Sequence, residues 1–198
     1  MPAAQAMESQ VIDQNDYETA RLGVKSLLKM AGRIDDPGVL DTPARVIKAF
    51  REMTKGIWNN PETILSKLFE CKTDELIIVN GIDFVSLCEH HLLPFTGTAT
   101  VGYIPTGKVV GLSKIPRLVE CFAHRLQLQE QLTEQIANAM YSHPELKPKG
   151  VGCIIEATHA CMSCRGVRKA GARMITSAML GEFRDNPTLR GEFLNLRK

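Results

Sequence analysis

The sequence contains no long apolar run, no large excess of charge of either sign, and only 5 histidines. No stretch approaches the roughly 18 apolar residues of a membrane-spanning helix. The first ten residues, MPAAQAMESQ, lack the basic and apolar regions of a secretory signal peptide. A net charge of +2 gives no global reason to bind nucleic acid. We therefore expect a cytoplasmic protein that binds neither nucleic acid nor a membrane.

Internal repeats, low-complexity tracts and the P-loop motif G-x-x-x-x-G-K-[ST] are also absent from the sequence. The chain has 198 residues, 44% of them hydrophobic and 23% charged, which is an ordinary globular mixture. This length suffices for one domain with its own core and a helical extension. In a cytoplasmic protein, the 6 cysteines are more readily explained as thiols or metal ligands than as disulfides.

The pattern of apolar and turn residues predicts three regions: a flexible tail at 1–14, a helical N-terminal arm at 15–70, and a domain at 71–198. Within that domain, β-branched residues predict strands, and apolar periodicity predicts helices near 113–124 and 126–142. The predicted strands are 74–86, 97–104, 151–161 and 173–180. This order of elements predicts an α+β fold. Its small sheet would have exposed edges, which favours oligomerisation.

Two short Cys/His pairs indicate a metal site. In LCEHHLLPF, residues 87–95, a cysteine and a histidine stand three apart, at Cys88 and His91. In the predicted strand VGCIIEATHAC, alternate residues share one face, and His159 and Cys161 continue the apolar face that starts at Val151. Thiolate and imidazole together are ligands that suit zinc.

The residues alone leave three interpretations of these pairs open. The cysteines can be inert core thiols beside a hydrogen-bonded histidine. A closed structural zinc site has four ligands, and Cys164 extends the candidates to Cys88, His91, Cys161 and Cys164. A catalytic site instead uses three ligands and leaves one position for water. The acid–base side chains that zinc binding does not need favour this third interpretation; they are Glu89, His90 and His159.

A second constellation indicates an anion site. The segment VVGLSKIPRLVE opens a predicted helix at Ser113, where free backbone N–H groups and the helix dipole favour a negative charge. Lys114 and Arg117 lie three residues apart on one face of that helix. Arg45 and Arg165 could join them around a phosphorylated substrate. The alternative is a solvated basic helix start.

Four ordered segments resemble type I GTP cyclohydrolases from about residue 40 to the C-terminus: CEHHLLPFTGTATVGYIP, VVGLSKIPRLVE, RLQLQEQLTEQIA and THACMSCRGVRKAGARMITSAMLGEF. The resemblance implies a zinc-dependent hydrolase that opens the guanine ring of GTP at C8, releases formate and forms 7,8-dihydroneopterin triphosphate. This reaction is the first step of tetrahydrofolate and pterin biosynthesis. The implied fold is the tunnelling fold, a small antiparallel sheet with two paired helices. Its subunits form a toroidal homodecamer with active sites between neighbours.

The resemblance also implies a role for each matching residue. The implied zinc ligands are Cys88, His91 and Cys161, and the implied catalytic residues are His90 and His159. The implied guanine contacts are Glu130 and Gln129, although helical periodicity alone makes Glu130 a solvated surface residue. The implied phosphate contacts are Ser113, Lys114, Arg117, Arg165 and Arg45.

Cys164 departs from the family pattern. We expect it to be a spectator, because the implied phosphate ligand Arg165 follows it directly; the alternatives are a fourth zinc ligand and a thiol that oxidises with Cys161. Two rival functions follow from related reasoning. A nitrile reductase of the same fold would use a cysteine nucleophile and NADPH, and a non-enzymatic module would use zinc only as a structural staple.

Overall fold

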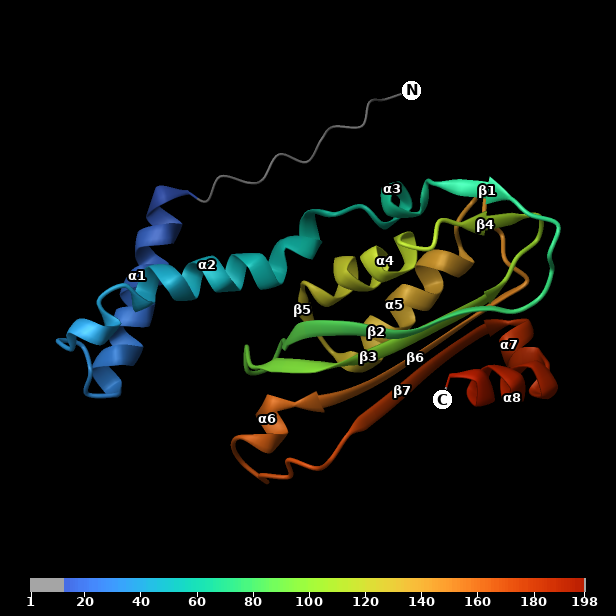
Figure 1. Ribbon diagram of the computed structural model, residues 1–198. Coiled ribbons are helices and arrows are strands. Elements are labelled where there is room, and N and C mark those ends of the chain that lie inside the picture. Colours follow the sequence, from blue (N-terminus) through green and yellow to red (C-terminus); the bar gives the residue numbers. More distant parts are fainter. Residues whose placement is uncertain (1–12, 198) are drawn as a thin grey trace.

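The computed structural model describes residues 13–197, so most of the expected flexible tail, residues 1–12, lies outside the described residues (Figure 1). The N-terminal arm consists of short and long helices, which are α1 (Gln14–Met30), η1 (Pro37–Val39), α2 (Thr42–Thr54), η2 (Lys55–Trp58) and α3 (Pro61–Leu65). In Figure 1, α1 and α2 stand away from the sheet, and α1 buries none of its residues. Across residues 13–197, no helix has the length and apolarity to cross a membrane.

A five-stranded sheet forms the centre of the chain, in the order β5-β2-β3-β6-β7. Four of its strands pair antiparallel, and β5 pairs parallel to β2. The strands are β2 (Ile77–Cys88), β3 (Pro94–Ile104), β5 (Leu126–Gln127), β6 (Gly150–His159) and β7 (Met174–Gly181). A separate two-stranded ribbon pairs β1 (Leu68–Glu70) with β4 (Lys108–Val110). Mixed sheet and helix content confirms the predicted α+β class.

Helices cover both faces of the sheet (Figure 1). One face packs under α4 (Lys114–Ala123) and α5 (Gln129–Tyr141), and its core contains fully buried Leu118, Leu132 and Ile155. The opposite face is covered at one end by α7 (Glu182–Asp185) and α8 (Pro187–Leu196). A smaller core there has Phe183 and Phe193 at its centre. The other half of that face remains open.

The predicted strands and helices are confirmed with two corrections. The segment expected to be helical from residue 126 begins as strand β5, and α5 starts at Gln129. The strand expected to reach Cys161 ends at His159, and Cys161 lies in the short helix α6 (Ala160–Ser163). The alternation correctly places Val151 on the buried face of β6. It cannot continue to Cys161, because α6 breaks the two-residue period.

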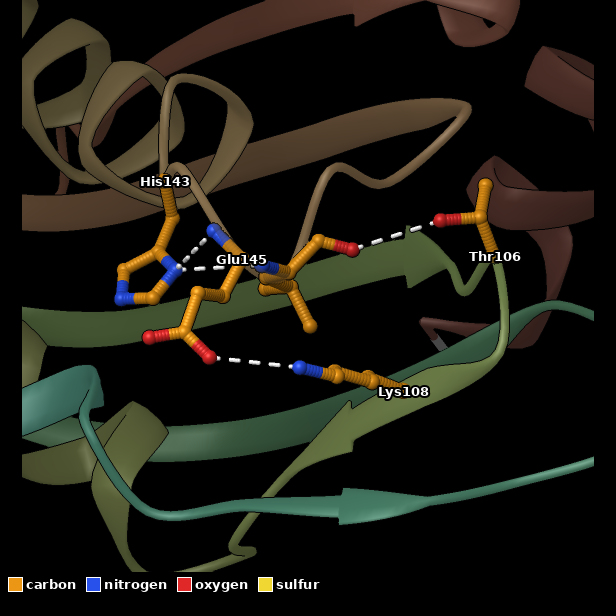
Figure 2. A network of polar contacts seen from close by, with 5 residues as sticks. Thr106, Lys108, His143 and Glu145 are labelled. Atoms are coloured by element: carbon orange, nitrogen blue, oxygen red, sulfur yellow. Dashed lines mark hydrogen bonds and ion pairs between the residues drawn. The ribbon is translucent and has the colours of Figure 1, made fainter.

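Polar contacts tie the turn after α5 to the loop before β4 (Figure 2). His143 is buried, and its Nδ1 accepts a hydrogen bond from the backbone N–H of Glu145 (3.3 Å). The Glu145 carboxylate pairs with Lys108 Nζ at 3.2 Å, and the Thr106 hydroxyl donates to the carbonyl oxygen of Lys147 at 2.8 Å. These contacts hold β4 in place, and β4 leads directly into the start of α4.

Candidate metal centre and active site

The end of β2 and the turn after it bring a thiol and an imidazole together. Cys88 is buried at the last position of β2. The backbone N–H of Leu92 donates to the Cys88 carbonyl oxygen (2.9 Å), and Leu92 adopts the left-handed conformation with φ 53°. This tight turn returns His91 over the strand end, so that its Nδ1 lies 3.9 Å from Cys88 Sγ.

A second thiol reaches the same place from the other side of the sheet. Strand β3 pairs with β6 so that Phe95 faces His159, and α6 begins immediately after His159. Ligand atoms of Cys88, His91 and Cys161 consequently lie within 4.8 Å of one another, the one such set of three found in residues 13–197.

The chemistry of these three side chains fits a zinc ion. Two sulfur donors and one imidazole nitrogen form a ligand set typical of zinc, and three ligands leave a position for water. Burial raises the pKa of the Cys161 thiol, and the adjacent Cys88 thiol raises it further. The Cys161 thiol therefore resists ionising unless a cation binds it.

Cys164 lies outside this group. Its Sγ donates to the carbonyl oxygen of Ala160 at 2.8 Å, within the turn of α6. Among residues 13–197, the set of possible metal ligands contains Cys161 but not Cys164. The geometry therefore favours three protein ligands over a closed set of four.

Two further side chains flank the metal group. The His90 side chain is 62% exposed, and its ring stands nearly perpendicular (81°) to the His91 ring. His90 thus lies next to the ligand group without belonging to it. Arg165 Nη1 lies 2.9 Å from His91 Nε2, which brings a cation to the edge of the centre.

His159 is held from two sides. Its ring stacks on Phe95 with centroids 4.6 Å apart and planes 2° apart, and its Nε2 lies 2.8 Å from Gln129 Oε1. Partial burial lowers the pKa of His159, and the negative charge of Glu130 opposes this shift. Glu130 is exposed at the first turn of α5, directly after Gln129. Gln129 differs from Glu130 because its side chain is buried and hydrogen-bonded within the chain.

Of the predicted anion-binding residues, only Arg165 meets the metal group within one chain, and the other four lie elsewhere. Ser113 precedes α4 next to β4, whereas α4 ends next to β5, which pairs with Cys88 (Figure 1). The intervening helix has 10 residues and is about 15 Å long. Lys114 and Arg117 belong to the same distant end of α4. Arg45 lies in the arm helix α2, where it pairs with Asp41.

Sequence reasoning missed two groups of residues that support His159. Phe95 provides the stacking surface, and the hydroxyls of buried Thr133 and half-buried Thr176 hydrogen-bond to Gln129. All three lie in segments that resemble the family, but nothing in their spacing marks them as partners of His159 or Gln129. Only the register of β3, β6 and β7 brings them to His159, and the spacing within any one segment does not indicate that register.

A sequence model of the family described as GTP cyclohydrolase I matches residues 20–198. Similar proteins include GTP cyclohydrolase 1 of Campylobacter jejuni subsp. doylei, 53% identical over 87% of this chain and 91% of its own length. GTP cyclohydrolase 1 of Chlorobaculum tepidum is 53% identical, covering 87% of this chain and 77% of that protein. The Streptomyces avermitilis protein of the same name is 46% identical, covering 93% and 92%.

Among solved structures, the crystal structure of the archaeosine synthase QueF-Like in the apo form aligns with a TM-score of 0.46 and 18% identity. That alignment covers 56% of this chain and 97% of the other.

Proposed function

The chain belongs to the GTP cyclohydrolase I family and is a hydrolase that acts on GTP, and we propose that it opens the guanine ring at C8. The products are formate and 7,8-dihydroneopterin triphosphate, and the reaction is the first step of tetrahydrofolate and pterin biosynthesis in the cytoplasm. The observation that carries this proposal is the meeting of Cys88, His91 and Cys161 with two histidines that are free of the ligand group. Ring opening needs a hydrolytic centre with separate acid–base groups, and this arrangement can supply both.

Cys88, His91 and Cys161 hold a zinc ion in this proposal, with the fourth position left for water. Zinc supplies an activated water at neutral pH when it is bound. Arg165, which contacts His91, lies where it can orient an anionic substrate at the edge of the centre.

His159 and His90 transfer the protons of the reaction. His159 gives a proton to N7 of the guanine ring as water adds to C8. A second addition of water at the resulting formyl carbon releases formate. His90, exposed beside the ligand group, moves protons while the ribose opens and rearranges before the pterin ring closes.

Glu130 selects guanine. A carboxylate accepts hydrogen bonds from N1–H and the 2-amino group of guanine, and adenine offers no such donors. Its exposure at the first turn of α5, directly after Gln129, supports this role. The resemblance also implies a guanine contact for Gln129, but its buried side chain favours the different role argued below. The remaining polar residues bind the triphosphate; they are Ser113, Lys114, Arg117, Arg165 and Arg45.

We further propose that complete sites form between subunits of a toroidal homodecamer with the tunnelling fold. The anion-binding start of α4 lies at the opposite end of that helix from the metal group, which supports a site shared between chains. The arm helix α1 also leaves apolar side chains exposed, with Leu22 at 62%, Leu27 at 63% and Met30 at 84%. Such a surface is typical of a helix that packs against another chain.

The direct test is to mix zinc-loaded protein with GTP and to assay formate and a pterin that fluoresces after oxidation. Wild type and Cys164→Ala should form both products, whereas Cys161→Ala should lose bound zinc and turnover together. Retention of stoichiometric zinc by Cys161→Ala would contradict the ligand assignment. Absence of both products in the wild type would contradict the proposed reaction.

Mixing variants tests the shared site. Lys114→Ala removes part of the proposed phosphate end, and His159→Ala removes part of the proposed catalytic end. Each variant alone should be nearly inactive. Subunits that are dissociated, mixed and reassembled should regain activity, because some sites then combine two intact halves. If the mixture is no more active than its components, each site is built from a single chain.

A further inference from the structure

The two ring nitrogens of His159 have different surroundings: Nε2 contacts the protein, and Nδ1 is the other. Stacking on Phe95 fixes the plane of the ring, and Nε2 faces Gln129 Oε1 at 2.8 Å. The remaining nitrogen, Nδ1, is the one available to a substrate. The proton on a neutral imidazole can sit on either nitrogen, so the partner of Nε2 decides which chemistry Nδ1 can perform.

The surroundings of Gln129 determine which way its carboxamide points. Nitrogen and oxygen of a carboxamide have nearly the same shape, so the hydrogen-bond partners must distinguish them. The Nε2 end lies 3.1 Å from the carbonyl oxygen of Ile155 and 3.0 Å from that of Met174. Carbonyl oxygens only accept hydrogen bonds, so this end must be the NH₂ group. The reverse orientation would set three oxygens against each other in a site where Gln129 is 1% exposed.

Two neighbouring hydroxyls, of buried Thr133 and half-buried Thr176, agree with this orientation of the carboxamide. Gln129 Nε2 also donates to Thr176 Oγ1 at 3.1 Å. Thr133 Oγ1 donates to the backbone carbonyl oxygen of Gln129 at 2.7 Å. The single hydroxyl hydrogen of Thr133 is used in that bond. In the 2.6 Å contact between the two hydroxyls, Thr176 must therefore be the donor and Thr133 the acceptor. Each hydroxyl then donates once, and the two hydrogens of the Gln129 NH₂ group are shared among its three acceptors.

We propose that Gln129 is a positioning residue that holds His159 as the Nε2–H tautomer and directs bare Nδ1 toward the substrate. Its Oε1 can only accept, so His159 Nε2 must carry a hydrogen. That hydrogen is present in both neutral imidazole and imidazolium. Gln129 therefore holds the ring in one orientation while Nδ1 gains and loses the proton. The use of this proton in catalysis rests on the proposed function, whereas the tautomer does not.

The tautomer can be measured without any assay of turnover. Magic-angle-spinning ¹⁵N spectra of zinc-loaded protein labelled only in histidine contain 5 rings per chain. The signals lost in His159→Asn identify the ring of interest. We expect that ring, when neutral, to be wholly Nε2–H in the wild type, and a second tautomer to appear in Gln129→Met. A wild-type ring with its proton on Nδ1 overturns the proposal, even if Gln129→Met fails to fold.

Kinetics separate a positioning role from direct guanine binding. Gln129→Met should lower kcat by about 100-fold, the low end of general acid–base effects, with little change in KM for GTP. A raised KM with unchanged kcat would make Gln129 a guanine contact and overturn the proposal. If the wild type forms neither formate nor pterin, the proposed function fails while the ¹⁵N spectra still decide the tautomer.

The chain offers a matched control in the same segment. Gln127 is also a buried glutamine, 2% exposed, but its Nε2 donates to Phe122 and Gln135 rather than supporting His159. Gln127→Met should therefore leave the ring of His159 in its single tautomer. If Gln127→Met also mixes the tautomers, the effect is a general loss of packing, and the assignment to Gln129 is wrong.

Discussion

A single methyl group added at Gly97 tests how closely the strands that carry the site are packed. Gly97 lies in β3 opposite Ala157 of β6, two residues from the pair of Phe95 and His159. A Cβ at Gly97 would lie 1.9 Å from the carbonyl oxygen of Glu156 and 2.6 Å from Ala157 Cα. These are backbone atoms of a paired strand, so no side-chain rotation can relieve the contact.

The geometry sets the size of the effect. Ordinary contact begins at 3.4 Å, so β3 and β6 must move apart by roughly 1.5 Å at this point. Overpacking of this kind costs about 1–3 kcal/mol or more, and each ladder hydrogen bond that is lost adds about 1 kcal/mol. We therefore expect Gly97→Ala to lower the free energy of unfolding by at least about 3 kcal/mol. Activity should fall with it, because the displaced segment of β6 ends at His159.

Urea denaturation at fixed protein and zinc concentration measures this loss, since binding and assembly also shift the midpoint. Gly23→Ala is the matched control, because Gly23 lies in α1 and its added Cβ meets nothing within 4 Å. That substitution should stabilise the helix by about 0.5–1 kcal/mol. An unchanged midpoint in Gly97→Ala, or an equal fall in Gly23→Ala, would refute the packing argument.

Four further substitutions have expected outcomes. His90→Ala should keep zinc and lower kcat by about 10²–10⁴-fold, whereas His91→Ala should lose zinc as well; metal analysis and turnover distinguish them. Cys164→Ala should retain zinc content and activity, because its thiol hydrogen-bonds to a nearby backbone carbonyl and not to the metal group. Burial and then the charge of Lys55 lower the pKa of His124 below its ordinary 6.5, so the unfolded chain binds a proton first and stability falls as pH drops below that value. His124→Gln should lose less stability than wild type between about pH 7 and pH 5 in denaturant titrations.

Local sequence signals predicted much of the fold, and they failed where contacts between distant segments, or a local turn, determine the secondary structure. Runs of β-branched residues indicated β2, β3, β6 and β7. Leu126 and Gln127 were misassigned to a helix, because their strand exists only through parallel pairing with Leu87 and Cys88. Cys161 was misassigned to a strand, because small and apolar residues in THAC fit both a strand and the turn of α6.

In the candidate site, too, local spacing predicted some residues, whereas contacts between distant segments were not predicted. Cys88 and His91 are three residues apart, so one tight turn suffices to join them, and spacing alone indicated the pair. The surroundings of Gln129 depend on the pairing of Ile155 with Thr176 and on the placement of α5 against both strands. No single segment encodes that arrangement. Sequence reasoning therefore identified the candidate metal ligands and acid–base residues, but not the residues that orient His159.

The position of α4 supports the proposal that two chains complete each site. Ile115, Leu118, Val119 and Phe122 bury this helix against the sheet. Burying each such side chain contributes about 1.5–3 kcal/mol, so releasing the helix would cost about 6–12 kcal/mol. That cost is comparable to the whole stability of a typical domain, about 5–15 kcal/mol. Lys114 thus cannot move to the metal group while the chain stays folded. If phosphate and guanine bind in one site, a second chain must supply one end of it.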